Sequence, residues 1–276
     1  MDLKLAVFLR EVLVRHWGIA LASIKGELAY RFEFFSAILG TLITTTLLYF
    51  LWKAIYASAT SIELSEQSLI TYVVLGQAFS FSRPGQRRVI MRVSQKIRSG
   101  DVALDLVRPT DYQAMHFSDT LAAYLMETLL VSLPSYALAV LVFGIDPPAS
   151  WEAAAGFVAS MGGAFLLVFS LDFFIGVMAF WTLSVWGIAY AKMAVVDVLA
   201  GTIVPLSLFP GWLGAVAMAL PFRGLAYAPL SIYTGAISGA DIWANILSQL
   251  AWAAALILLT RLLWLRARRR LVIQGG

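Results

Sequence analysis

Six long apolar stretches constrain the fold of this chain more than any other feature of its sequence. They lie near residues 34–53, 67–82, 120–144, 154–182, 193–213 and 243–264. A helix that crosses a bilayer needs roughly 20 mainly apolar residues. The composition, with 61% hydrophobic and 13% charged residues, excludes an ordinary soluble domain. We therefore expect an all-α polytopic membrane protein with six transmembrane helices, folded as a single domain over residues 1–276.

The basic residues predict which side of the membrane each loop occupies, because lysine and arginine resist translocation. Of the 20 basic residues, 18 fall in residues 1–33, in the loop 83–119, at Lys192 and in the tail from Arg261. Only Lys53 and Arg223 fall on the other side. Since the number of spans is even, both termini are expected in the cytosol. The net charge of +4 reflects this asymmetry and does not imply a nucleic-acid partner.

Residues 3–25 have the pattern of an amphipathic helix. Charged side chains gather on one face of this helix, and apolar side chains cover much of the rest. We expect residues 1–33 to hold an interface helix on the cytosolic side, before the chain turns into the bilayer near Gly26. A plain membrane anchor is the simpler alternative.

The loop 83–119 carries seven basic residues and has a helical pattern of its own over residues 86–98. Arg88, Arg92 and Lys96 repeat at positions i, i+4 and i+8. Like charges at that spacing destabilise an isolated helix by roughly 0.2–0.5 kcal/mol per pair. We therefore expect an acidic or oxygen-rich partner to face them.

The residues that follow this helix predict a compact turn. Gly100 suits the position that ends a helix, Asp101 can cap the short turn Val102–Leu106, and Pro109 stops it. We interpret the loop as a preformed cytosolic plug. The alternative is a basic loop that touches anionic lipid, which requires neither the Gly100 break nor the Pro109 stop.

The segment 201–238 is apolar but contains four prolines, which would break a continuous helix repeatedly. Broken backbone at membrane depth is tolerated only where it is buried in protein or lines a cavity. We expect a span that ends near Pro210, then short re-entrant or interfacial helices over residues 211–238 on the outer side, and then the last span. A plain extracellular loop is the alternative.

The sequence contains no recognisable catalytic motif. There is no cysteine, no metal-ligand spacing and no P-loop for ATP phosphates, so any energy source must come from another subunit. Glu127, Asp172 and Asp197 fall at membrane depth or its edge, where an acid is a functional hypothesis by default. Asp197 can pair with nearby Lys192, whereas no basic residue lies inside any predicted span to partner Asp172. A structural hydrogen bond is the alternative role for these acids.

Four segments together carry a family resemblance: IRSGDVALDLVRP at 97–109, IVPLSLFPGWL at 203–213, LPFRGLAYAPLSIYTG at 220–235 and RRLVIQGG at 269–276. The chain resembles the ABC-2 type permeases, the membrane subunits of ABC transporters. It is most similar to a bacterial branch that pairs two different permeases with one ATPase. The resemblance implies a multi-pass protein of the bacterial cytoplasmic (inner) membrane.

The resemblance also assigns roles to residues. The loop between the second and third spans would be the coupling helix that docks in a groove of the ATPase, through Arg88, Arg92, Lys96, Arg98, Gly100, Asp101, Arg108 and Pro109. The broken outer segment would close the exit of the pathway, with Pro205, Phe209, Pro210, Pro221, Phe222 and Pro229. This chain is expected to hold no cofactor or metal, since the partner ATPase dimer would hold ATP and Mg²⁺.

These expectations describe a non-catalytic permease subunit of an ATP-driven exporter that forms its path with a second, distinct permease. The many aromatic residues favour an amphipathic or lipid-like cargo. Two alternatives remain at this stage. An ion-coupled secondary transporter would need paired intramembrane charges and two related halves. A membrane enzyme that modifies lipids would need clustered His, Asp or Glu side chains at one interface.

Overall fold

The computed structural model describes residues 17–26, 31–58, 65–79, 88–107, 110–182 and 184–270. Of these described residues 85% are helical and none forms a strand, so the predicted all-α fold is confirmed for them. The helix 17–26 is the part of the predicted interface helix that is described. Two predicted coupling residues, Arg108 and Pro109, lie outside the described residues.

Four helices are long and apolar enough to cross a membrane: Phe32–Ser58, Tyr112–Phe143, Trp151–Phe180 and Ala240–Ala267. They correspond to the first, third, fourth and sixth predicted spans. The first lies in α2 (Arg31–Ser58) and the last is α12 (Ala240–Ala267), which continues into η6 (Arg268–Arg270).

The predicted second and fifth spans are short helices. α3 (Glu66–Ala78) has 13 residues and α9 (Trp186–Leu199) has 14. At 1.5 Å per residue each is about 20 Å long, against a hydrocarbon core of about 30 Å. α9 ends just before Gly201, whose φ is 73°, so the helix does not continue to residue 213. The prediction of six spans is therefore confirmed for four helices only.

The third span consists of three parts. α6 (Tyr112–Glu127) passes through a π-helical turn, η2 (Thr128–Ser132), into α7 (Leu133–Phe143). Pro134 explains the irregular turn, because proline lacks the N–H that a regular helix would donate and its ring displaces the carbonyl one turn earlier. Gly144 ends α7 with φ = 61°.

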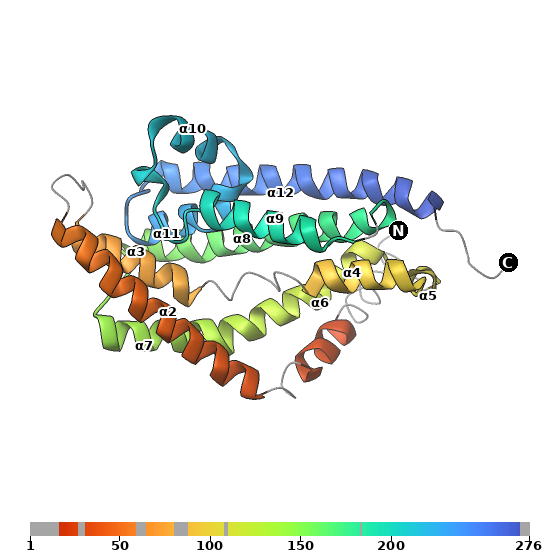
Figure 1. Cartoon of the computed structure of the whole chain (residues 1–276), viewed down its shortest axis with the longest axis horizontal. Helices are drawn as coiled ribbons and strands as arrows, with labels where there is room; N and C mark the ends of the chain where they lie inside the picture. The colour runs from red at the N-terminus through yellow and green to blue at the C-terminus, as the bar shows by residue number, and fades with distance from the viewer. Residues whose placement is uncertain are drawn as a thin grey trace, which may run out of the picture.

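α8 (Trp151–Val177), extended by η3 (Met178–Phe180), is the central helix of the bundle. In its most apolar window 72% of the residues are buried, against 22% or less in the other three candidate spans. α12 lies along α8, and Figure 1 shows α9 with its axis roughly along theirs but its chain running the opposite way. The exposed apolar side chains of α2 and α12 are those expected of helices in contact with lipid or with another membrane subunit.

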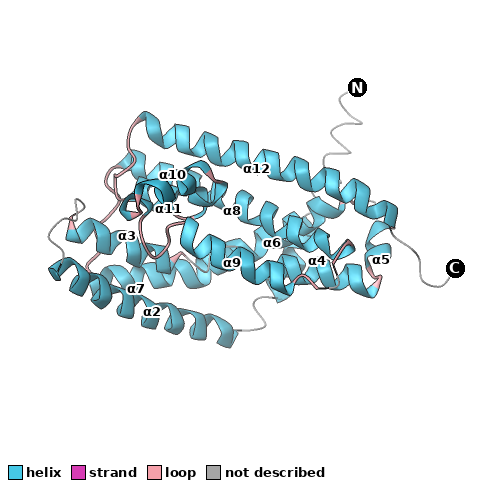
Figure 2. Ribbon diagram, turned by 45° about the horizontal axis from the view of Figure 1, so that its top comes forward, coloured by secondary structure: helices cyan, strands magenta, loops and turns pink. Residues whose placement is uncertain are grey.

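The two ends of the bundle differ in structure (Figures 1 and 2). The α4 end contains α4 (Arg88–Ser99), α5 (Val102–Leu106) and the last turns of α12. The α11 end contains η4 (Leu206–Leu208), α10 (Gly211–Ala219), η5 (Pro221–Leu225) and α11 (Tyr227–Tyr233). The prediction that residues 201–238 form no continuous helix is confirmed, and their depth in the membrane stays a prediction.

Candidate functional site at the α4 end

α4 is amphipathic, and its apolar face lies directly on α8. Val89, Ile90 and Val93 are buried in this contact. Gly176 of α8 makes the close approach possible, because a Cβ atom at this position would lie 2.9 Å from the Cβ of Val93. The position of α4 is therefore fixed by packing against the most buried of the four candidate spans.

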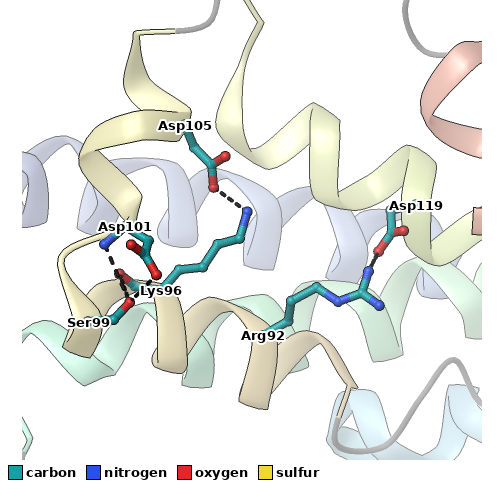
Figure 3. A network of polar contacts seen from close by, with 6 residues as sticks. All are labelled: Arg92, Lys96, Ser99, Asp101, Asp105 and Asp119. Atoms are coloured by element: carbon teal, nitrogen blue, oxygen red, sulfur yellow. Dashed lines mark hydrogen bonds and ion pairs between the residues drawn. The ribbon is translucent and has the colours of Figure 1, made fainter. Parts of the chain in front are cut away.

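A tight turn joins α4 to α5, and its structure corrects one prediction. Gly100 ends α4 with φ = 80°, as its sequence position predicts. Asp101 does not cap α5 with its side chain. Its backbone is already helical, with φ = −61° and ψ = −17°, whereas a capping residue takes an extended conformation. Instead the Ser99 hydroxyl donates to the Asp101 carboxylate over 2.7 Å (Figure 3).

The basic stripe of α4 faces acids of its own chain. Arg92 forms an ion pair with Asp119 of α6, and Lys96 forms one with the buried Asp105 of α5 (Figure 3). The expectation of an acidic counterpart is thus confirmed, but the acids found belong to this chain. Both were missed from the sequence, although Asp105 lies in the IRSGDVALDLVRP segment.

The tip of this unit presents apolar side chains. Leu104 is 69% exposed and Val107 is 84% exposed, and Leu106 is exposed as well. Arg98, Gly100 and Asp101 are exposed at the same turn. The tip therefore presents apolar side chains that no described residue covers, which is a frequent property of protein contact surfaces.

A buried ion pair joins α8 to α9. The Lys192 ammonium lies 2.7 Å from a carboxylate oxygen of Asp172, and the two side chains are 8% and 0% exposed. The prediction that Asp172 has no basic partner is therefore wrong. Lys192 was assigned to a cytosolic loop, but α9 begins at Trp186, so this residue lies inside a helix and faces α8.

The other two acids singled out from the sequence differ from Asp172. Asp197 is exposed on α9, and the ion pair that Lys192 forms is with Asp172. Glu127 is half-buried at the end of α6, next to the π-helical turn. Only Asp172 is a fully buried acid in a candidate span, and its second oxygen has no hydrogen-bond partner in the described residues.

Hydrogen bonds between uncharged groups predominate at the α11 end, although Arg223 also donates to the Ser248 hydroxyl there. The buried Gln249 of α12 accepts from the Ser160 hydroxyl of α8 and donates to the carbonyl oxygens of Ser160 and Gly224, over 2.7–3.1 Å. The Tyr233 hydroxyl lies 2.8 Å from that of Tyr136 and donates to the Asp146 carbonyl. The predicted gate residues lie at this end: Pro205, Pro221 and Pro229 are buried, Phe209 and Phe222 are half-buried, and Pro210 is exposed.

Neither end offers a metal centre in the described part of the chain, where no group of three or more His, Asp or Glu side chains is close enough to hold an ion.

Comparison with known families gives a clear match: residues 37–275 fit the model of the family described as "ABC-2 family transporter protein". No curated protein matches the chain. The matched residues include both ends of the bundle.

Proposed function

The chain belongs to the ABC-2 family of transporter proteins, and from this premise we propose that it is the permease subunit of an ATP-driven exporter. As a family member it is a membrane permease of an ABC transporter. The proposal adds that a separate dimeric ATPase binds ATP and Mg²⁺, and that a second, distinct permease completes the path. Both termini would lie in the cytosol of a bacterial cell, on the inner face of its cytoplasmic membrane.

The unit formed by α4 and α5 is our candidate for the contact with the ATPase. The observation that carries this assignment is the exposed apolar tip at Leu104 and Val107, held on a helix that packs against α8. Because α4 is locked to α8 at Gly176, a push on the tip would move the two helices together as a rigid body. Arg98, Gly100 and Asp101 lie at the tip and are the predicted coupling residues best placed for docking.

Arg92 and Lys96 take a different role in this proposal. Each already binds a carboxylate of the same chain, so we assign them to shaping the unit instead of contacting the ATPase. At the other end of the bundle, the short helices of residues 201–238 would close the exit. Cargo would be amphipathic or lipid-like, as the aromatic content suggests.

ATPase assays on the purified complex test the coupling assignment. Leu104→Asp and Asp101→Ala should lower transport-linked ATPase activity about tenfold, which corresponds to ~1.4 kcal/mol of lost docking energy. Glu152→Ala is a matched control, since Glu152 is also an exposed acid near a helix start but lies at the α11 end. Unchanged activity in both tip variants, with the complex intact, would contradict the assignment.

The buried Lys192–Asp172 pair favours a second candidate, an ion-coupled transporter, because such proteins place paired charges in the membrane. Purified chain in vesicles, without any ATPase, distinguishes the two functions. Cargo movement driven by a proton or sodium gradient alone would support the second candidate. Movement that requires the ATPase and ATP would support the first.

A further inference from the structure

A cavity of about 600 Å³ lies beside the basic stripe of α4, between this helix, the helix 17–26, the first turn of α2 and α6. Its polar lining in the described residues includes three cations and two carboxylates. They are Arg88, Arg92, Lys96, Glu33 and Asp119, and the ring of His116 joins them. The cavity is therefore cationic and is large enough for a phosphate group with its substituents.

The ion pairs of the stripe leave hydrogen-bonding capacity in the cavity. A guanidinium group has five N–H donors and an ammonium group has three, so one carboxylate partner does not saturate Arg92 or Lys96. The Arg92 side chain is also 47% exposed, and its ion pair with Asp119 is correspondingly weak. Planar guanidinium groups suit phosphate oxygens, to which they bind through two parallel hydrogen bonds.

His116 provides independent evidence for a missing partner. Its ring is almost fully buried and packs edge-on against Tyr112, with ring centroids 4.6 Å apart. The Nε2 atom of His116 has no hydrogen-bond partner in the described residues, although the residue lines the cavity. A buried polar atom without a partner costs about 1–3 kcal/mol. The atom itself is not exposed to solvent in the unliganded chain, so a ligand oxygen would reach it after a small shift of the lining side chains, and this contact would remove the penalty.

The surroundings of the cavity indicate where its ligand comes from. The first turn of α2 lines the cavity through Glu33. Phe32 and Phe35 lie in the same turn and are largely exposed, as expected of side chains that contact lipid. Trp17, on the helix that forms another wall, is 64% exposed, and tryptophan concentrates at membrane–water interfaces. The cavity thus lies where charged surface gives way to apolar surface, which is the level of lipid phosphates.

We infer that this cavity binds the phosphate group of an anionic phospholipid from the leaflet on the α4 side of the membrane. Arg88 and Arg92 contact the phosphate oxygens, and His116 Nε2–H donates to the same headgroup. The site does not depend on the proposed ATPase contact, because the tip at Leu104 and Val107 is not part of its lining. Phosphate chemistry is common to lipids and soluble esters, so the experiment must separate these sources.

Binding to the purified chain in detergent, measured by native mass spectrometry, tests the inference. The probes are dioleoylphosphatidylglycerol, dioleoylphosphatidylcholine with the same acyl chains, and soluble glycerol 1-phosphate. Arg88→Gln and Arg92→Gln should each weaken binding of phosphatidylglycerol about fivefold. His116→Phe, which keeps an aromatic ring against Tyr112, should weaken it by about the same factor.

Two further variants make the test specific. Asp119→Asn removes a carboxylate that competes for Arg92, so binding of phosphatidylglycerol should become tighter, which general damage to the fold would not produce. Arg98→Gln removes the same charge from α4 but outside the cavity lining, and should leave binding unchanged. Melting temperatures of all variants establish that each is folded.

Each outcome decides the inference. Weaker binding in the two arginine variants, tighter binding in Asp119→Asn and no change in Arg98→Gln would support it. Equal binding of phosphatidylcholine, or the same loss in Arg98→Gln as in Arg92→Gln, would overturn it in favour of general surface attraction. Displacement of the lipid by an equal concentration of glycerol 1-phosphate would overturn the lipid as the source of the phosphate.

Discussion

The two ends of the bundle are held by different kinds of polar contact. The α4 end carries the ion pairs Arg92–Asp119, Lys96–Asp105 and Arg261–Asp111, and Lys192–Asp172 lies in the same half of α8. The α11 end is joined by neutral groups around Gln249 and Tyr233. Ion pairs therefore predominate in the half that we propose meets the ATPase, and hydrogen bonds between uncharged groups predominate in the half that we propose closes the exit.

This difference has a physical consequence. Ion pairs that are partly exposed are weak, are screened by salt and can exchange partners with an incoming anion. A buried amide that satisfies all its neighbours has no such alternative and holds one arrangement. The partly exposed ion pairs at the α4 end can thus exchange partners although the helices there are fixed by packing, whereas the buried hydrogen bonds at the α11 end cannot. The buried Lys192–Asp172 pair is the exception at the α4 end.

Lys192→Met should be the most damaging single change at the α4 end. It leaves the Asp172 carboxylate buried without compensation, which costs about 3–5 kcal/mol of unfolding free energy. Thermal unfolding in detergent micelles measures the loss. The double variant Lys192→Met with Asp172→Leu should recover most of it, because an apolar pair of similar volume needs no compensation. A single variant as stable as the wild type would show that the pair is not a structural tie.

Gln249→Leu should destabilise the α11 end by about 2–4 kcal/mol, since it removes the partners of Ser160 and Gly224 in a buried site. The loss should be the same at low and high salt, because no ion pair is involved. Asn245→Ala, one turn earlier on α12 and less buried, is the control and should change stability by about 0.5 kcal/mol or less. A strong salt dependence in Gln249→Leu would remove the distinction between the two ends.

Gly176→Ala should push α4 away from α8, because the new Cβ meets Val93 at 2.9 Å. Overpacking of this kind costs about 1–3 kcal/mol. The variant should also lose ATPase coupling. Gly176→Ala combined with Val93→Gly, which removes the Cβ atom that the new side chain meets, should restore coupling and most of the stability, apart from the about 1 kcal/mol that glycine costs inside a helix. Restored stability without restored coupling would mean that the α4–α8 contact does not transmit motion.

Arg92→Gln should have the smallest effect on stability, about 0–1 kcal/mol, because its ion pair with Asp119 is 47% and 23% exposed. A double-mutant cycle with Asp119→Asn measures the coupling energy of the pair directly, at low salt and at 0.5 M salt. At the higher concentration the Debye screening length is only a few ångströms. The coupling energy should vanish at the higher salt. A large coupling energy that persists at 0.5 M salt would show that the Arg92–Asp119 pair is a strong structural contact, contrary to this prediction.

Much of the architecture could be predicted because it depends on local sequence. The long apolar runs give α2, α8 and α12, and the prolines of residues 201–238 predict the breaks that the structure contains. Gly100 ends α4 with the positive φ that its position suggests. These features depend on residue type and spacing, which the sequence displays directly.

The contacts that define the site depend on tertiary structure and were missed. Lys192 and Asp172 lie on different helices, because the chain leaves the helical conformation between Phe180 and Trp186. Only the packing of α9 on α8 shows that the two side chains face each other. Asp101 failed as a cap because its own backbone is helical, which residue type alone does not reveal. Asp119, the partner of Arg92, lies 27 residues away on α6.

Site-specific cross-linking to the copurified ATPase tests the central claim most directly. The chain contains no cysteine, so Val107→Cys at the α4 end and Ala215→Cys at the α11 end each introduce a single thiol at an exposed position. A short thiol-attached photo-cross-linker at residue 107 should join the chain covalently to the ATPase, and the same reagent at residue 215 should not. Cross-linking to the ATPase from residue 215, with none from residue 107, would contradict the assignment of the α4 end as the motor contact.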